Sequence, residues 1–231
     1  MIEFLQTMSW TAVFQIIMID ILLGGDNAVV IALACRNLPE KQRLKGVLWG
    51  TAGAIILRVI LIAFAVTLLK IPFLKLIGGL LLLWIGIKLL IPEGDADHKI
   101  TGSESLWNAI KTIIVADFVM SVDNVIAIAG AAERADPSHQ FALIIFGLVV
   151  SIPIIVFGSQ LVLKLMDKFS WIVILGAGLL GWIAGGLIVT DPGVTAQFGP
   201  PSSLTKYSAE VICVALVVGL GLLLAKRHKA Q

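Results

Sequence analysis

Apolar stretches of membrane-spanning length alternate along this chain with short polar segments. An α-helix needs roughly 20 predominantly apolar residues to cross the hydrocarbon core of a bilayer. Proline, glycine and charged residues gather between the stretches, where turns are expected. The pattern predicts seven transmembrane helices, near residues 10–35, 46–69, 73–91, 106–132, 141–163, 170–190 and 208–225.

The composition is that of a membrane protein. Of the 231 residues, 58% are hydrophobic and 14% are charged, whereas about one quarter of an average soluble domain is charged. We therefore expect an all-α, polytopic membrane protein whose main partner is the lipid bilayer. The formal net charge of +2 gives no sign of a nucleic-acid partner.

The basic residues are distributed unequally between the two sides of the predicted bundle. Cytoplasmic loops of membrane proteins carry an excess of Lys and Arg. Most Lys and Arg residues here fall on the side that holds the C-terminal tail, with the densest groups at 36–45 and 226–229. The bias predicts an extracytoplasmic N-terminus and a cytoplasmic C-terminus.

One motif occurs twice. The segment DILLGGDNAVVIALA (20–34) aligns with DFVMSVDNVIAIAGA (117–131), and both begin with Asp, five residues, Asp and Asn. Each copy spans three predicted helices, so the second must enter the membrane in the opposite orientation. Inverted repeats of this kind are a common plan of secondary transporters, in which the substrate site lies near the midplane between the halves.

The repeat divides the chain into five predicted segments. A seventh helix follows the two copies, and a polar linker joins them. The segments are a first repeat (1–92), a cytoplasmic linker (93–105), an inverted second repeat (106–190), an extracytoplasmic loop (191–206), and the seventh helix with its basic tail (207–231).

Four aspartates fall near the middle of predicted helices: Asp20, Asp26, Asp117 and Asp123. Each ionised aspartate at the bilayer centre costs about 3 kcal/mol on insertion scales, so four unpaired ones cost on the order of 10 kcal/mol. That sum rivals the whole stability of a typical domain. We therefore expect the four carboxylates to face a cavity, a partner or a bound ion.

The predicted ligands are mainly oxygen atoms. Asn27, Asn124 and Ser121 lie beside the aspartates in sequence, and carboxylate, amide and hydroxyl oxygens favour Mg²⁺, Ca²⁺ and Mn²⁺. Met18 and Met120 are also close in sequence. A thioether ligand from either would shift selectivity toward Mn²⁺, although both methionines could equally serve only in packing.

Two further features belong to this predicted site. Gly24 and Gly25 precede Asp26 and predict a break in the first helix, which would free backbone carbonyls for a cation. Arg58 is the one basic residue deep in a predicted span. We expect it either to pair with one of the aspartates or to act as a tethered cation that refills the site after the metal leaves.

The paired motif at 20–34 and 117–131 resembles that of the TerC family of integral membrane proteins, and the resemblance extends over about the whole chain. It implies a multi-pass protein of the bacterial plasma membrane, related to the LysE-type exporter superfamily, that exports metal ions and chiefly Mn²⁺. By motif match, the family's acidic metal-site residues correspond to Asp20, Asp26, Asp117 and Asp123, with Asn27 and Asn124 beside them.

The leading hypothesis is a secondary transporter that exports a divalent cation, most readily Mn²⁺, in exchange for H⁺ or Na⁺. It is not expected to be an enzyme or to carry a prosthetic group. Export of another divalent or of a small organic cation is an alternative, and so is an intramembrane aspartyl protease. A protease needs only one close pair of acids. The segment LGGD also lacks the first glycine of the corresponding protease motif. The oligomeric state, including a homo-oligomer, stays open.

Overall fold

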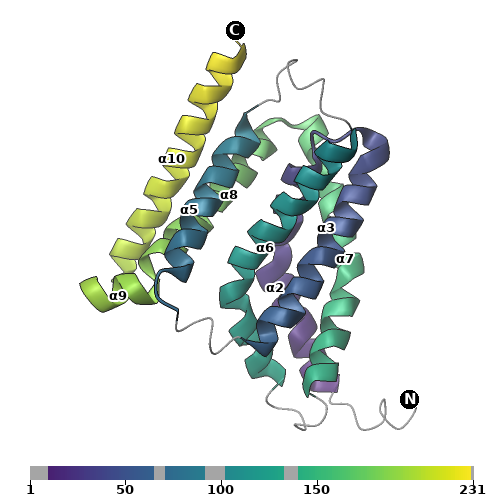
Figure 1. Ribbon diagram of the computed structural model, residues 1–231, viewed down its shortest axis with the longest axis vertical. Helices are drawn as coiled ribbons and strands as arrows, with labels where there is room; N and C mark the ends of the chain where they lie inside the picture. The colour runs from purple at the N-terminus through teal and green to yellow at the C-terminus, as the bar shows by residue number, and fades with distance from the viewer. Residues whose placement is uncertain (1–9, 65–70, 92–101, 133–139, 230–231) are drawn as a thin grey trace.

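The computed structural model describes residues 10–64, 71–91, 102–132 and 140–229, and within these ranges the chain is all α-helical, without strands. Figure 1 labels the helices. They are α2 (Trp10–Cys35), α3 (Glu40–Ala63), α5 (Leu74–Leu90), α6 (Gly102–Ala132), α7 (Gln140–Lys168), α8 (Trp171–Val189), α9 (Pro192–Phe198) and α10 (Ser203–Lys229).

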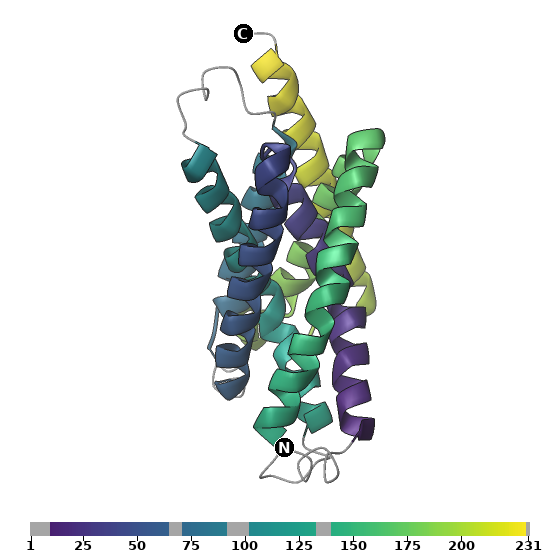
Figure 2. The same cartoon turned by 90° about the vertical axis from the view of Figure 1, so that its right-hand side faces the viewer.

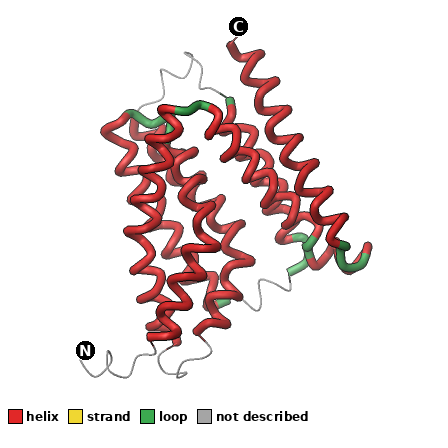
Figure 3. Tube along the Cα trace, turned by 180° about the vertical axis from the view of Figure 1, so that it is seen from behind, coloured by secondary structure: helices red, strands yellow, loops and turns green. Residues whose placement is uncertain are grey.

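The long helices form two adjoining groups. Helices α2, α3, α6 and α7 pack together on one side, and α5, α8 and α10 pack together on the other (Figure 1). The same division is seen from behind in Figure 3, and Figure 2 shows the long helices running roughly along one axis. Within the groups, α2 packs mainly on α7, α3 on α6, and α8 on both α5 and α10.

The outer surface is apolar as well as the interior. The interior is filled by Leu, Ile, Val and Ala from α2, α3, α5, α6, α7 and α8. Large apolar side chains such as Trp49, Trp84 and Phe157 are exposed on the outside. An apolar surface of this extent on a soluble monomer would be unusual, whereas lipid is a suitable environment for it.

Within the part of the chain that the structure describes, five helices are long and apolar enough to cross a membrane: α3, α6, α7, α8 and α10. Helix α5 has 17 residues, somewhat fewer than the roughly 20 that usually cross a bilayer. Many α2 side chains before Gly25 lie outside the described part of the structure. The remaining apolar part of this helix, Gly25–Cys35, is shorter still. The structure thus supports a multi-pass membrane protein, while the predicted count of seven spans stays a prediction.

Several predicted boundaries differ from the structure, and one predicted loop contains a helix. Helix α6 begins at Gly102 rather than 106, and α7 ends at Lys168 rather than 163. Helix α3 begins at Glu40 rather than near 46, because Pro39 precedes the first turn and Glu40 lies favourably at the positive end of the helix dipole. Helix α10 begins at Ser203 rather than 208. The short helix α9 lies within the segment 191–206, which was predicted to be a loop.

The predicted helix break at Gly24 and Gly25 is wrong. Helix α2 continues without interruption from Trp10 to Cys35, and α6 is likewise continuous through Asp123. A glycine inside a helix costs only about 1 kcal/mol relative to alanine. A break in a membrane would instead expose several backbone groups where no water can satisfy them, which costs more.

Asp191 joins the start of two helices. Its carboxylate accepts hydrogen bonds from the backbone N–H groups of Gly193 and Val194 in α9, at 2.7 and 3.2 Å. It also accepts N–H bonds from residues 73, 75 and 76 at the start of α5, at 2.9, 3.0 and 3.2 Å. The α5 N-cap residue, Phe73, provides no side-chain cap of its own. One buried carboxylate therefore caps both helices and holds them together.

The Asp191 carboxylate also makes the stability of the protein depend on pH. Burial raises its pKa, but the backbone N–H bonds from Phe73, Leu76, Gly193 and Val194 outweigh burial and hold the pKa below its ordinary value. The unfolded chain therefore takes up the proton first as the pH falls. The stabilisation is fully present above about pH 4, the ordinary range of aspartate, and is lost as the pH falls through the lower folded pKa.

We expect the Asp191→Asn variant to be less stable than the wild type by about 2 kcal/mol at neutral pH, because it weakens two caps and removes the charge. The melting temperatures of both proteins in detergent, recorded over an acidic pH series, test this. Their difference should stay constant down to about pH 5 and shrink below about pH 4. A difference that is the same throughout the series would show that the charge of Asp191 contributes nothing.

Candidate cation site

A buried ion pair lies between α3 and α6. The Arg58 Nη2 donates to Asp117 Oδ1 at 2.5 Å, and the side chains are 2% and 6% exposed. Arg58 Nε donates to Ser121 Oγ at 3.0 Å, and the Ser121 hydroxyl donates to Asp117 Oδ2 at 3.0 Å. Because the serine lies one helical turn after the aspartate, all three side chains close into one hydrogen-bonded ring.

Asp26 and Asn27 lie on α2 and, unlike the Arg58–Asp117–Ser121 ring, contain buried polar atoms without hydrogen-bond partners among the described residues. Asn27 is buried, and neither its amide oxygen nor its amide nitrogen has a hydrogen-bond partner among the described residues. The same holds for Asp26 Oδ1, which is also buried. Asp26 is nevertheless close enough to Arg58 and Asp117 to interact electrostatically with both. Buried polar atoms of this kind commonly mark an ion or water that completes their coordination.

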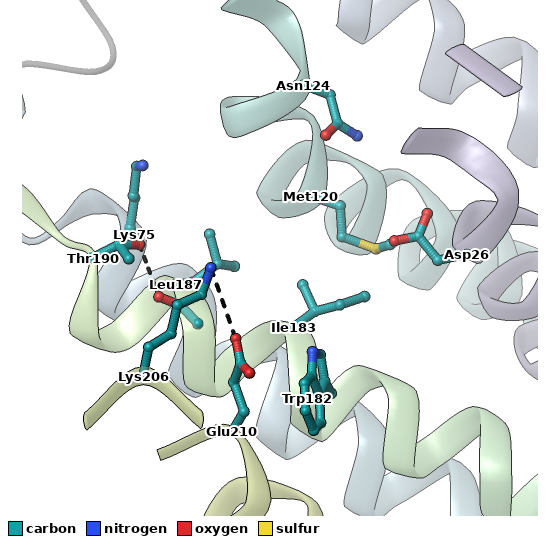
Figure 4. Close-up of a pocket in the computed structure, with 11 residues that line it drawn as sticks. Asp26, Lys75, Met120, Asn124, Trp182, Ile183, Leu187, Thr190, Lys206 and Glu210 are labelled. Atoms are coloured by element: carbon teal, nitrogen blue, oxygen red, sulfur yellow. Dashed lines mark hydrogen bonds and ion pairs between the residues drawn. The ribbon is translucent and has the colours of Figure 1, made fainter. Parts of the chain in front are cut away.

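Asp26 also lines a pocket of about 360 Å³. Met120 and Asn124 of α6 lie beside it, and Figure 4 shows these side chains on one wall of the pocket. Helices α5, α8 and α10 form the opposite wall. The described residues on that wall are Lys75, Trp182, Ile183, Gly186, Leu187, Thr190, Lys206 and Glu210.

The other predicted site residues differ in whether they are buried, exposed or outside the described part of the chain. Met120 is buried, whereas Met18 is exposed on α2 and is not among the described residues of the pocket wall. The expectation of a soft ligand therefore narrows to Met120. The side chains of Asp20 and Asp123 lie outside the part of the chain that the structure describes. Among the described side chains, no group of three or more His, Cys, Asp and Glu could hold a metal.

Glu210 is a buried acidic residue that is not among the predicted site residues. It lies inside the predicted seventh span, and an ionisable residue within a span is a functional candidate by default. The repeated motif gave no signal for it, because helix α10 lies outside the two repeats. Glu210 is 3% exposed, and its Oε1 lies 4.0 Å from the amine of Lys206, one turn earlier on α10.

Comparisons with known proteins place the chain among bacterial membrane proteins. The family model described as "Integral membrane protein TerC family" matches residues 5–230. "Uncharacterized membrane protein YjbE" of Bacillus subtilis is 44% identical over 88% of this chain and 90% of its own length. No solved structure matches.

Two more distant relatives are longer than the matched region. "Uncharacterized membrane protein YceF" of Bacillus subtilis is 32% identical over 54% of this chain and 52% of its own length. "UPF0053 inner membrane protein YoaE" of Escherichia coli is 27% identical over 83% of this chain and 40% of its own length. The chain thus spans about half or less of these two relatives.

Proposed function

This chain belongs to the TerC family of integral membrane proteins, and on that premise we propose that it is a secondary transporter that exports a divalent cation from the cytoplasm. The preferred ion is Mn²⁺, and the counter-ion is H⁺ or Na⁺. The protein is a multi-pass protein of the bacterial plasma membrane. The proposed direction rests on the resemblance to the family alone, whereas the proposed ion rests on that resemblance and on the ligand chemistry.

One observation carries the proposal. In the bundle interior, Asp26 Oδ1 and both amide atoms of Asn27 are buried without hydrogen-bond partners among the described residues. A buried carboxylate oxygen without a partner is costly, and the cost rises in a membrane. A cation that passes through the site would satisfy the two oxygen atoms, Asp26 Oδ1 and Asn27 Oδ1, transiently, which is what a transporter requires of its substrate site.

The packing supports an inverted repeat. If α2, α3 and α5 correspond to α6, α7 and α8, the pair of α2 with α7 corresponds to the pair of α6 with α3. Both pairs are among the most extensive in the structure. In Figure 1, α2 and α6 also run in opposite directions along the bundle. We propose that alternating access arises when one repeat rocks against the other around the aspartates.

The ligand chemistry favours Mn²⁺. Carboxylate and amide oxygens bind Mg²⁺, Ca²⁺ and Mn²⁺, so Asp26 and Asn124 alone do not choose between these ions. The buried Met120 lines the same pocket and offers a thioether sulfur. A sulfur ligand is tolerated better by Mn²⁺ than by the harder Mg²⁺ and Ca²⁺, so Met120 would shift the preference toward Mn²⁺.

The buried positive charge of Arg58 lies close to the proposed cation site, so any mechanism of ion exchange must include it. Its guanidinium is held by Asp117 and Ser121. A divalent cation near Asp26 would be repelled by Arg58 unless the arginine stays on Asp117. We propose that the ion pair keeps Asp117 neutralised while Asp26 binds the ion, so that the site does not gather uncompensated negative charge when the ion leaves.

The test is uptake of Mn²⁺, Mg²⁺, Ca²⁺ and Zn²⁺ into proteoliposomes that contain the purified chain, with and without a pH gradient. We expect Mn²⁺ transport that depends on the gradient, and we expect Asp26→Asn to reduce its rate at least tenfold, because the variant keeps the shape and removes the charge.

The matched controls are Glu40→Gln and Asp167→Asn, which change exposed carboxylates at helix ends in the same way. Both should transport at the wild-type rate. Wild-type activity in Asp26→Asn would remove Asp26 from the substrate site. A wild-type protein that moves none of the four ions would refute divalent-cation transport altogether.

A further inference from the structure

Glu210 packs against two glycines of α8, Gly185 and Gly186. Helix α10 approaches α8 so closely that a Cβ on Gly185 would lie 2.5 Å from Glu210 Cα, and a Cβ on Gly186 would lie 3.1 Å from Glu210 Oε1. Two adjacent glycines therefore let the α10 backbone and the carboxylate lie directly against α8. The apolar stretch Ser203–Arg227 contains this carboxylate and is long enough to cross a membrane.

The Glu210 carboxylate is buried but poorly satisfied. Its Oε1 lies 4.0 Å from Lys206 Nζ, too far for a hydrogen bond. Its Oε2 is buried without a hydrogen-bond partner among the described residues. Isolated buried carboxylates are strongly disfavoured, so an atom in this position needs a partner beyond those that the described part of the chain offers.

The open side of the carboxylate faces the pocket. Figure 4 shows Glu210 extending from α10 into the space that Asp26, Met120 and Asn124 line from the other side. The pocket holds about 360 Å³, which is room for a cation with several of its waters. Two carboxylates, one from each group of helices, line this pocket together with Lys75 and Lys206. Carboxylates that face one space in this way are suited to a divalent cation.

We propose that Glu210 is a second carboxylate ligand of the transported cation, and that Lys206 competes with the cation for it. The inference rests on the proposed transport function and extends the site beyond the two repeats to helix α10. The Lys206 side chain is 48% exposed, so its amine can withdraw into solvent when a cation arrives. When the cation leaves, the amine returns and keeps the carboxylate from remaining unpaired.

The test measures Mn²⁺ binding to the purified full chain in detergent, from the electron paramagnetic resonance signal of the free ion. We expect Glu210→Gln to raise the dissociation constant about tenfold, the loss of one charge-assisted interaction. Lys206→Gln should lower it by roughly two- to fivefold, because the competing charge is partly exposed. The double variant should behave like Glu210→Gln alone, since Lys206 acts only through Glu210.

Glu40→Gln and Lys226→Gln are the matched controls, because they make the same changes at exposed positions of α3 and α10. Neither should change the dissociation constant. Melting temperatures show whether Glu210→Gln is folded. The isosteric side chain should preserve the packing against Gly185.

The same variants in proteoliposomes separate this inference from the proposed function. Mn²⁺ transport by the wild type, with Glu210→Gln unchanged in both dissociation constant and KM, would overturn the role of Glu210 and leave the transporter intact. Binding that weakens in Glu210→Gln, in a wild-type protein that transports nothing, would support Glu210 as a ligand and overturn transport. A wild type that does not bind Mn²⁺ overturns both.

Discussion

Replacing Asp117 by alanine is expected to lower the free energy of unfolding by about 3 kcal/mol and to abolish transport. The variant leaves the Arg58 guanidinium in the bundle interior without the carboxylate that lies 2.5 Å from it. Removing one partner of a buried ion pair is typically this costly, because the remaining charge stays out of water. Chemical or thermal unfolding in detergent measures the loss.

The chain contains a matched control. Arg43 and Asp167 form an ion pair of the same 2.5 Å length between α3 and α7, but their side chains are 23% and 53% exposed. Solvent screens that pair, so Asp167→Ala should cost at most about 1 kcal/mol. Equal losses in the two variants would mean that burial gives the Arg58–Asp117 pair no special weight.

A double variant separates stability from transport. Replacing Arg58 by methionine together with Asp117 by leucine removes both charges and fills similar space. Such replacements of buried pairs are often neutral or stabilising. Ser121 can turn its hydroxyl to a backbone carbonyl one turn earlier. We therefore expect most of the stability to return while transport stays absent, and a double variant that transports Mn²⁺ would exclude both charges from the mechanism.

The second large effect is expected at Gly185. Its Cβ in a Gly185→Ala variant would lie 2.5 and 2.7 Å from Glu210 Cα and N, which are backbone atoms that cannot rotate away. Helix α10 must then move off α8. Overpacking of this kind costs about 1–3 kcal/mol. Because Glu210 moves with α10, transport should fall as well.

Gly178 on the same helix provides the control. A Cβ there would meet only Val214 and Val218 of α10, at 3.6 and 3.7 Å, which is ordinary contact. Gly178→Ala should therefore be neutral or stabilise the protein by up to about 1 kcal/mol, since alanine is the better helix former. Melting temperatures that fall equally in the two variants would contradict the close approach of α10 at Gly185.

Several features of the fold could be predicted because they depend on residues that are close together in the sequence. Apolar runs of membrane length predicted the helices near 73–91 and 170–190 to within one or two residues of α5 and α8. Glycines spaced four apart are typical of close packing between membrane helices, and the glycines at 181 and 185 both meet the α10 backbone. The break at Gly24 and Gly25 was predicted wrongly because the frequency of glycine in loops says little about a helix packed inside a membrane protein, where a break would leave backbone groups unsatisfied.

The sequence by itself determined that this is an all-α membrane protein with a repeated acidic motif, because length, hydropathy and motif spacing are properties of consecutive residues. Only the tertiary structure decided that Arg58 lies on Asp117, that Asp191 caps α5 from 116 residues away along the chain, and that Glu210 shares a pocket with Asp26. These pairs are distant in sequence, and their energies depend on which helices pack together. Burial determines how strongly each charged group interacts with its neighbours, and burial depends on how the helices pack.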